Sequence, residues 1–309
     1  MRIKNLMLDF SYKENTNEVY KNRNNCRLFE DLSQNSLNMF FRGGDIISTK
    51  PQVTGKHEPV ITEFINYAAT KGYADFLIDI GANIGLTSCQ SGDLFKEVHM
   101  FEPNPYCFKI LEVNSFLSIN SAKCYLYQFG LGDKNKIVKL TVPKKNWGGG
   151  FVKDSSNAYT QEILAKKDGF QKIDNKNYYN VEILIKKTSL ELKKLFTTLK
   201  NRKREMGVIK IDIEGYEKVV LKGIADSINN KLKLIIIFEN HDPNFNIKEC
   251  ESFFKGRAKA YKFESKQPSW ERFAKIMKFF SRLLKKKIIH QLNEGTPSNW
   301  KGDIALIIE

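Results

Sequence analysis

The chain has 309 residues, 41% of them hydrophobic, and it carries 50 Lys and Arg against 35 Asp and Glu, a formal net charge of +15. This length and apolar content indicate a globular protein with a large core and exclude a disordered chain or a small disulfide-stapled scaffold. The positive charge either attracts anionic partners, such as phosphorylated substrates, nucleic acid or acidic lipid, or simply favours solubility.

Neither a membrane span nor a cysteine framework is expected. The most apolar run, residues 234–238, is far shorter than the roughly 18 residues of a membrane-spanning helix. Asp9 and Lys13 interrupt the only apolar stretch that resembles a signal-peptide core, so we expect a cytoplasmic protein. The five cysteines contain no C-x-x-C pair, which argues against a zinc site or disulfides.

The chain is expected to divide at about residue 54. Residues 1–54 are mixed and Asn-rich, and we interpret them as an N-terminal extension that packs on a main domain of residues 55–309. The main domain begins with a predicted helix from Pro59 to about residue 70, because apolar residues recur at helical spacing and proline is tolerated in a first turn.

Beyond this helix, strand and helix patterns alternate. Strands are predicted at residues 76–80, 98–101, 124–129, 208–213 and 232–238, and helices at 84–95, 105–117 and 216–224. Further strand-like segments lie at 137–142, 181–185, 259–263 and 304–308, with a short helix at 161–167. The alternation predicts an α/β fold in which helices cover both faces of a mostly parallel sheet.

The segment IDIGANIGLTS, residues 78–88, is the sharpest motif. Asp79 ends a predicted strand, and Gly81 and Gly85 flank a tight turn into a helix, where small residues let a ligand approach the backbone N–H groups. Asn83 occupies a position where the dinucleotide fingerprint G-x-G-x-x-G requires glycine. The motif therefore predicts a cofactor site other than an NAD site.

A second motif, FEPNP at residues 101–105, places Glu102 at the end of the next predicted strand. An acidic residue about 20 positions after the first motif is placed to accept hydrogen bonds from both ribose hydroxyls of an adenosine cofactor. The alternative is that Asp79 caps a helix and Glu102 is a solvated strand end. The two motifs in β-α-β order favour the cofactor site.

With these motifs and IKIDIEGYEKVVLKG at residues 209–223, the chain resembles the FkbM family of S-adenosylmethionine-dependent methyltransferases. The resemblance implies a class I methyltransferase fold, a Rossmann-like, doubly wound, seven-stranded sheet that is mostly parallel with an antiparallel last strand. It implies S-adenosylmethionine as the cofactor. The implied cofactor contacts are Asp79, Gly81, Asn83 and Gly85 for the methionine part, Glu102 for the ribose and Asp133 for the adenine. A Gly-Asp turn explains Asp133 equally well.

Members of this family are mostly assigned as O-methyltransferases of sugars or other hydroxylated natural products. The resemblance therefore implies a hydroxyl oxygen of a sugar or surface glycan as the acceptor. Methyl transfer from a sulfonium is an in-line displacement, so the enzyme mainly aligns the nucleophile with the methyl group and excludes water. A sugar hydroxyl is a poor nucleophile at neutral pH and needs a base, or a metal that acidifies it.

Candidate bases are expected after the fourth and fifth predicted strands, because ligands bind outside the carboxyl ends of parallel strands. Asp212 and Glu214 follow one of these strands, and Glu239 and His241 follow the other. We take Asp212, Glu239 and His241 as candidate catalytic residues and Glu214 as a substrate contact. The same three candidates are alternative ligands for a divalent cation such as Mg²⁺ or Mn²⁺, and their spacing leaves metal dependence undecided.

Two further segments bear on the acceptor. His57 and Glu58, just before the first predicted helix, resemble a family feature beside the active site and are candidate substrate contacts, with a helix-entry turn as the alternative. Within a predicted insertion at about residues 266–300, residues 271–290 combine a helical apolar stripe with seven Lys or Arg and one Glu. Such a helix either binds an anionic membrane surface, where a lipid-linked glycan acceptor would lie, or covers the sheet.

Two other functions compete with glycan methylation. A nucleic-acid methyltransferase would use the basic surface as a phosphate track, but no Asn-Pro-Pro-Tyr-type motif follows the fourth predicted strand and no RNA-binding module is recognisable. An inactive, membrane-associated accessory protein would have no need of an intact cofactor motif. The sequence therefore favours a glycan O-methyltransferase in the cytoplasm, with peripheral attachment to the inner face of the cell membrane as an extension of that hypothesis.

Overall fold

The structure is a computed structural model of the 309-residue chain. It describes residues 16–34, 36–155, 157, 159–170, 172–242, 245–266, 289–294 and 301–309. Most of the predicted basic helix, residues 271–288, lies outside the described residues. Its last two positions, Ile289 and His290, form the start of a strand and not the end of a helix.

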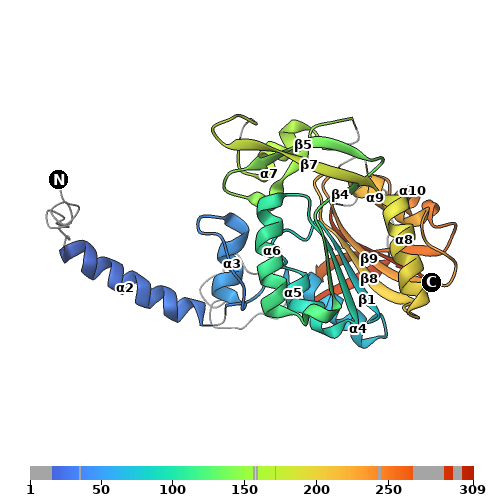
Figure 1. Ribbon diagram of the computed structural model, residues 1–309, viewed down its shortest axis with the longest axis horizontal. Helices are drawn as coiled ribbons and strands as arrows, with labels where there is room; N and C mark the ends of the chain where they lie inside the picture. Colours follow the sequence, from blue (N-terminus) through green and yellow to red (C-terminus); the bar gives the residue numbers. More distant parts are fainter. Residues whose placement is uncertain are drawn as a thin grey trace, which may run out of the picture.

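The core of the fold is an eight-stranded sheet of order β11-β10-β12-β9-β8-β1-β2-β3 (Figure 1). Its strands are β1 (Phe76–Ile80), β2 (Glu97–Phe101), β3 (Cys124–Tyr127), β8 (Met206–Ile211), β9 (Lys233–Asn240), β10 (Ala258–Lys266), β11 (Ile289–Glu294) and β12 (Gly302–Ile308). The five strands from β3 to β9 are parallel, and β12 is antiparallel to both of its neighbours, β9 and β10. The predicted class I sheet with its antiparallel last strand is confirmed, and β11 adds an eighth strand beyond β10.

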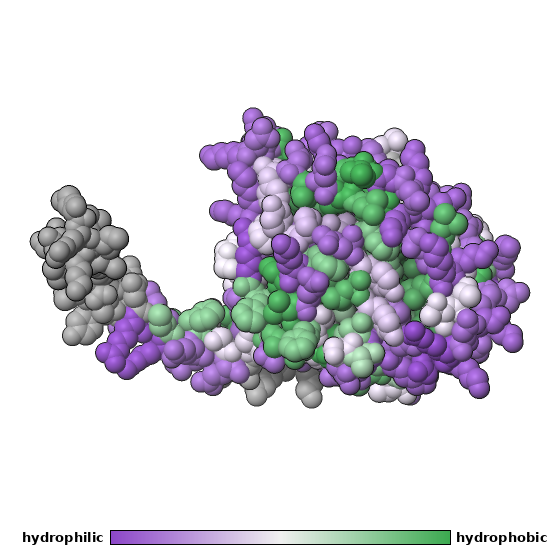
Figure 2. All heavy atoms as spheres, viewed as in Figure 1, coloured by the Kyte–Doolittle hydropathy of each residue, from purple (hydrophilic) through white to green (hydrophobic). Residues whose placement is uncertain are grey.

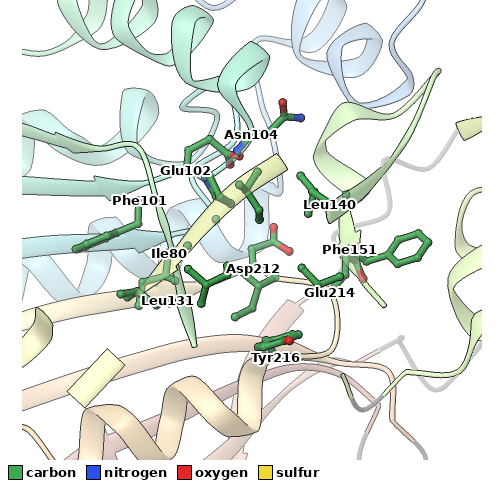
Figure 3. A pocket seen from close by; sticks show the side chains of 18 of the residues that line it. Ile80, Phe101, Glu102, Asn104, Leu131, Leu140, Phe151, Asp212, Glu214 and Tyr216 are labelled. Atoms are coloured by element: carbon green, nitrogen blue, oxygen red, sulfur yellow. The ribbon is translucent and has the colours of Figure 1, made fainter. Parts of the chain in front are cut away.

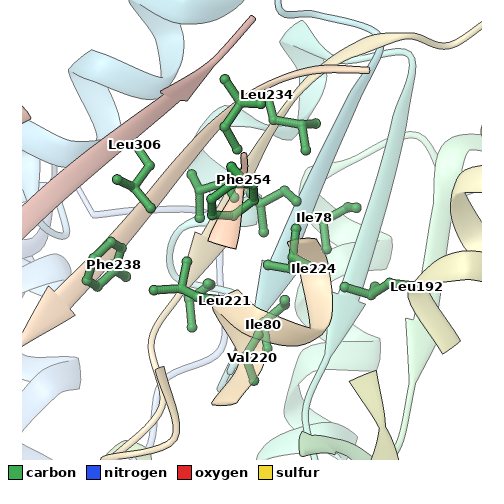
Figure 4. Close-up of a cluster of buried hydrophobic side chains, with 14 of the residues drawn as sticks. Ile78, Ile80, Leu192, Val220, Leu221, Ile224, Leu234, Phe238, Phe254 and Leu306 are labelled. Atoms are coloured by element: carbon green, nitrogen blue, oxygen red, sulfur yellow. The ribbon is translucent and has the colours of Figure 1, made fainter. Parts of the chain in front are cut away.

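Helices cover both faces of this sheet because the strands carry apolar side chains on both faces. On one face, α8 (Thr188–Asn201), α9 (Glu217–Ala225) and α10 (Ile247–Phe253) pack on alternate residues of the central strands, as Ile78, Ile80 and Leu234 show in Figure 4. On the other face, α4 (Pro59–Thr70) and α6 (Pro105–Ser118) pack on the intervening residues. The doubly wound arrangement follows from this alternation.

A second, four-stranded sheet lies beyond the carboxyl ends of β1, β2 and β8 (Figure 1). Its order is β4-β7-β5-β6, and its strands are β4 (Gly130–Gly132), β5 (Lys136–Pro143), β6 (Phe151–Val152) and β7 (Tyr178–Lys187). It carries α7 (Gln161–Lys167) and the short 3₁₀ helix η3 (Trp147–Gly149). We call this sheet with its connections, residues 130–187, the cap. The strand-like segments predicted at 137–142 and 181–185 pair antiparallel within it.

One predicted helix is much shorter than expected. Only α5 (Ser88–Ser91) and the 3₁₀ helix η1 (Gly92–Leu94) form within residues 84–95. Asn83 and Gly85 have φ angles of 52° and 92°, which lie in the left-handed region, so the chain there makes a turn and cannot continue as a right-handed helix. This turn becomes one wall of the site.

The N-terminal segment contains α2 (Thr16–Ser33), which extends away from the rest of the molecule (Figure 1), and α3 (Ile46–Thr54). Phe40 exchanges two backbone hydrogen bonds with the side chain of Asn114 on α6. Figure 2 shows a mostly hydrophilic face with hydrophobic residues over the α6 region, where Val113 and Phe116 are exposed. Among the described residues, no helix is both long and apolar enough to cross a membrane.

Candidate active site

A cavity lies between the cap and the carboxyl ends of β1, β2 and β8 (Figure 3). Its apolar wall comes from both sheets and includes Ile80, Phe101, Leu131, Leu140, Phe151 and Ile185. Its polar side chains are Glu102, Asn104, Asp212 and Glu214. A mostly apolar cleft with a few convergent polar groups at this edge of a parallel sheet is the usual position of a ligand site.

The glycine turn after β1 is shaped by close packing. Gly81 has φ 87°, and a Cβ at this position would collide with the backbone oxygen of Asp212. A Cβ at Gly85, where φ is 92°, would lie 2.9 Å from the sulfur of Cys89 and 3.0 Å from Leu111. Both glycines are therefore required by conformation and by space, and the turn is held directly against the chain that follows β8.

Glu102 is buried at the end of β2, where two backbone N–H groups hold its carboxylate. The N–H of Asn83 donates to Oε2 at 2.8 Å, and the N–H of Asn104 donates to Oε1 at 2.7 Å. Burial raises the pKa of Glu102 to about 7, and these two hydrogen bonds oppose that rise. Each carboxylate oxygen has a second lone-pair direction, so Glu102 retains the capacity to accept hydrogen bonds from a ligand in the cavity.

Asp79 is buried on the other face of β1, and its side chain does not line the cavity. Its Oδ2 accepts a hydrogen bond of 2.6 Å from the hydroxyl of Ser88, and burial raises its pKa to about 6. In the sheet register Asp79 lies directly opposite Lys210 of β8, so the two side chains share one face. The structure thus places Asp79 beneath the glycine turn and beside a lysine.

Lys210 is a site residue that the sequence analysis missed. It is only 1% exposed, and its Nζ lies 3.1 Å from Oδ2 of Asp212 and 3.4 Å from Oε2 of Glu58. Burial alone would lower the pKa of Lys210, but the charges of Asp212 and Glu58 outweigh it and raise the pKa above its ordinary value. The lysine therefore stays an ammonium and joins the predicted base to the predicted substrate contact.

His57 and Glu58 enter the site from the turn before α4. Glu58 has φ 40°, in the left-handed region, and Nε2 of His57 lies 3.9 Å from its Oε2. Burial lowers the pKa of His57, although the charges of Glu58 and Asp212 act against that change. The structure therefore brings His57, Glu58 and Asp212 together around Lys210.

Glu239 and His241 follow β9 and form a pair with each other. Nε2 of His241 lies 2.9 Å from Oε1 of Glu239, and the backbone N–H of His241 donates to the hydroxyl of Tyr159 at 3.0 Å. Asp303 of β12 lies opposite Glu239 in the register. Burial, together with the charges of Glu58 and Glu239, raises the pKa of Asp303 to about 6. Asp303 was also missed by the sequence analysis.

The other predicted contacts lie in different surroundings. Glu214 lines the cavity, and its backbone oxygen accepts a hydrogen bond of 2.8 Å from the side chain of Asn157. Asp133 is paired with Lys136 at 3.0 Å and does not line the cavity. Among the described residues, no group of three or more His, Cys, Asp or Glu is arranged to hold a metal ion, so Asp212, Glu239 and His241 do not form a ligand set there.

The cap contributes residues that no motif indicated. Trp147, Gly148 and Gly150 line the cavity, and a Cβ on Gly148 would collide with the side-chain nitrogen of Asn83. The run of three glycines at 148–150 was the available signal, because a glycine permits another side chain, here that of Asn83, to approach its backbone closely. The cap turn therefore lies directly on the glycine turn.

The topology defines a class I methyltransferase-type fold, and the cavity lies at the carboxyl edge of its parallel strands. Residues 79–285 match the family model described as the methyltransferase FkbM domain. The chain belongs to this family and is a methyltransferase, which confirms the resemblance seen in the sequence.

Individual relatives are more distant. Methyltransferase sdnD of Sordaria araneosa is 27% identical over 176 residues, which cover 55% of this chain and 67% of that protein. Among solved structures, an O-methyltransferase from Bacillus cereus in complex with SAH is 11% identical, with 82% of this chain and 83% of that chain covered and a TM-score of 0.37. A precorrin 8W decarboxylase from Methanobacterium thermoautotrophicum is 12% identical, with coverage of 88% and 100% and a TM-score of 0.39.

Proposed function

We propose that this methyltransferase transfers a methyl group from S-adenosylmethionine to a hydroxyl oxygen of a sugar or surface-glycan acceptor. The observation that carries the proposal is the position of Glu102 and Asp212 on the wall of one cavity. Glu102 is placed for the ribose of a nucleoside cofactor, and Asp212 is placed for a proton that leaves an acceptor. The family membership supports the methyl transfer itself.

The residues around Glu102 fit S-adenosylmethionine. The carboxylate of Glu102 is fixed by two backbone N–H groups and can accept the ribose hydroxyls, while Ile80 and Leu131 offer an apolar surface to the adenine. Gly81 leaves the turn without a side chain, so the cofactor can approach the backbone. When bound, the cofactor supplies a methyl group on a positively charged sulfur, which a nucleophile attacks in line.

Asp212 is the proposed general base. Its carboxylate is 41% exposed at the cavity and lies 3.1 Å from the ammonium of Lys210, which favours its charged form. Asp212 would take the proton that the acceptor hydroxyl loses when its oxygen is methylated. Glu239 and His241, which pair with each other, are the second candidates for this role. They are close to the charges around Lys210, because Glu239 and Glu58 both act on Asp303.

The acceptor class is tested by methyl transfer with a deuterated methyl group on S-adenosylmethionine. The acceptors are methyl glycosides, nucleotide sugars, a lipid-linked glycan, tRNA and duplex DNA, and the products are read by mass spectrometry. We expect a mass increase on a sugar hydroxyl with the wild type and none with Asp212→Asn. Label found only on nucleic acid, or on a nitrogen or carbon of the sugar, would contradict the proposed acceptor.

We further propose that the predicted basic segment 271–290, without Ile289 and His290 of β11, attaches the enzyme reversibly to anionic membranes, where lipid-linked glycans are available. The support is the sequence pattern, and each Lys or Arg near an anionic surface contributes about 1 kcal/mol to such binding. The test is co-sedimentation with phosphatidylglycerol vesicles of the wild type and of a variant with Lys285, Lys286 and Lys287 all changed to Gln. A matched triple change of Lys193, Lys194 and Lys200, which are exposed on α8, is the control.

Binding should decrease as salt rises and should decrease further in the first triple variant but not in the control. Equal binding to neutral phosphatidylcholine vesicles, or equal binding by all three proteins, would leave the segment without a membrane role.

A further inference from the structure

The strand residue Lys210 is unusual because its ammonium is fully buried in the middle of the sheet. It is among the largest side chains of the described residues that are less than 2% exposed. A buried charge is tolerated only when opposite charges and hydrogen bonds compensate for the lost hydration. The side chains around Lys210 therefore identify the negative charges that its ammonium compensates.

Five titratable groups face the ammonium from four separate segments. They are Asp212 after β8, Glu58 and His57 before α4, Asp79 on β1 and Asp303 on β12. Two of these carboxylates are in direct contact with Nζ, at 3.1 Å for Asp212 and 3.4 Å for Glu58. The ammonium of Lys210 thus lies among four carboxylates of the described residues and touches two of them, while Lys50 acts on the same group of charges through His57.

Glu58 is held in place by this contact. Its Oε2 is buried and accepts no hydrogen bond from the described residues, and the ammonium of Lys210 lies 3.4 Å from that oxygen, against 3.9 Å for Nε2 of His57. Its backbone is in the left-handed region, an unfavourable conformation for a residue that is not glycine. The turn before α4 is therefore kept in a strained conformation that directs a carboxylate to Lys210.

We propose that Lys210 is the positioning residue of methyl transfer, whose ammonium keeps Asp212 charged and directed to the cavity and ties the His57–Glu58 turn to it. This inference rests on the proposed function, because it gives Asp212 the role of base. Lys210 does not line the cavity, so it acts through Asp212, which does.

The consequence of losing the ammonium follows from simple electrostatics. With Lys210 neutral, Glu58, Asp79, Asp212 and Asp303 repel one another, and each of them takes up a proton more readily. Asp79 and Asp303 are the first to do so, because burial already raises the pKa of each to about 6. A protonated Asp212 cannot accept the acceptor proton, and a repelled Glu58 releases its turn. Both losses should be relieved when one carboxylate is removed together with the lysine charge.

The first test needs no acceptor and uses thermal unfolding of the full chain. The variants are Lys210→Met, Glu58→Gln and the double variant, with Lys218→Met, Glu249→Gln and their double variant as the control for a surface ion pair of 2.8 Å. We expect Lys210→Met to lower Tm by about 5 °C or more at about pH 7.5 and by clearly less at about pH 5, where the carboxylates begin to protonate. Glu58→Gln should then raise Tm in the Lys210→Met background.

The control pair should shift Tm by less than about 1 °C and without dependence on pH. If Lys210→Met does not fold, a folded double variant supports the proposal, and failure of both variants to fold overturns it. Additive effects of Lys210→Met and Glu58→Gln, or a Tm loss that is the same at both pH values, would reduce Lys210 to a packing role and overturn it as well.

The second test is the pH–rate profile of methyl transfer to the sugar acceptor found in the labelling experiment. We expect the acid limb of kcat to move to higher pH in Lys210→Met, by about one pH unit, while the KM for S-adenosylmethionine stays within about twofold of the wild type. An unchanged acid limb with a uniformly lower rate would overturn the positioning role. Absence of any sugar methylation by the wild type would overturn the proposed acceptor. The role of Lys210 would then be tested by the Tm values of the single and double variants.

Discussion

The two halves of the site hold their carboxylates by different means. In the half built from the glycine turn and β2, both oxygens of Glu102 accept hydrogen bonds from backbone N–H groups. In the half built around β8, the carboxylates of Asp212 and Glu58 are balanced by the ammonium of Lys210. The first half depends on the path of the main chain, and the second on one side chain.

This difference indicates how each half responds to its surroundings. Backbone N–H groups carry no ionisable proton and stay in place as long as the turn does, so the donors to Glu102 are the same at every pH and only its own carboxylate titrates, with a pKa of about 7. The Lys210 half is a set of coupled charges, and a change in any one of them alters the others. Fixed backbone donors suit a cofactor that binds in every catalytic cycle. A set of coupled charges suits a step in which a proton is transferred.

The largest expected effect comes from Gly81, where the two halves touch. Gly81→Ala would place a Cβ against the backbone oxygen of Asp212 at a φ of 87°, so we expect the free energy of unfolding to fall by about 3 kcal/mol or more. Gly169→Ala is the control, since Gly169 has φ 75° but no atom within 4 Å of the new Cβ. Denaturant unfolding should show a loss of only about 1 kcal/mol there. Equal losses would mean that the contact between the halves is unimportant.

The next effect is on the chemical step. Asp212→Asn keeps the shape of the side chain and removes its negative charge, so kcat for sugar methylation should fall at least about 100-fold. The affinity for S-adenosylhomocysteine should stay close to that of the wild type, as it should in the control Asp226→Asn, an exposed residue after α9. A normal kcat would mean that Asp212 is not the base and would favour Glu239 or His241 for that role.

Removal of the Glu102 carboxylate tests the other half. Glu102→Ala should weaken the binding of S-adenosylhomocysteine by about 2 kcal/mol, measured by calorimetry, because hydrogen bonds to a charged group are lost. The same substitution at Glu112, exposed on α6, should leave the affinity unchanged. An affinity equal to that of the wild type in Glu102→Ala would mean that the ribose binds elsewhere.

The smallest expected effect is a dependence of stability on pH. Burial raises the pKa of Glu102 from 4.5 to about 7, so the folded state holds a proton that the unfolded chain has already lost. Stability from this group is therefore full below about pH 4.5 and is lost as the pH rises through 7. Glu102→Gln should flatten the fall in unfolding free energy over this range by on the order of 1 kcal/mol, while Glu112→Gln should not. A slope that Glu102→Gln leaves unchanged would place the titration elsewhere.

The local parts of the fold and of the site could be predicted from the sequence. Phe76–Ile80 was predicted at its observed bounds because an apolar run ends abruptly at a glycine turn. Gly81 and Glu102 were found because each stands at the end of a strand, within a short motif. The helix predicted at 84–95 was too long, since apolar spacing does not reveal that Asn83 and Gly85 adopt left-handed φ angles.

The charged half of the site could not be predicted in the same way. Lys210 lies within the segment IKIDIEGYEKVVLKG, but nothing in that segment shows that it is buried, because its burial depends on the register that sets it beside Asp79. Asp303 joins the cluster only because β12 pairs with β9, and Glu58 only because α4 returns to the same edge. These contacts join residues that are far apart in the chain, and no local pattern encodes them.

The position of β12 also has a consequence for how the chain reaches its native state. β12 is formed by residues 302–308, yet it lies between β9 and β10, which are made earlier on the ribosome. The two earlier strands have no backbone partner in each other, so this side of the sheet closes only after β12 has been synthesised. Such non-local pairing slows folding and leaves strand edges open in the meantime. The nascent protein should therefore depend on chaperones for longer than an α/β chain whose strands pair in the order of synthesis.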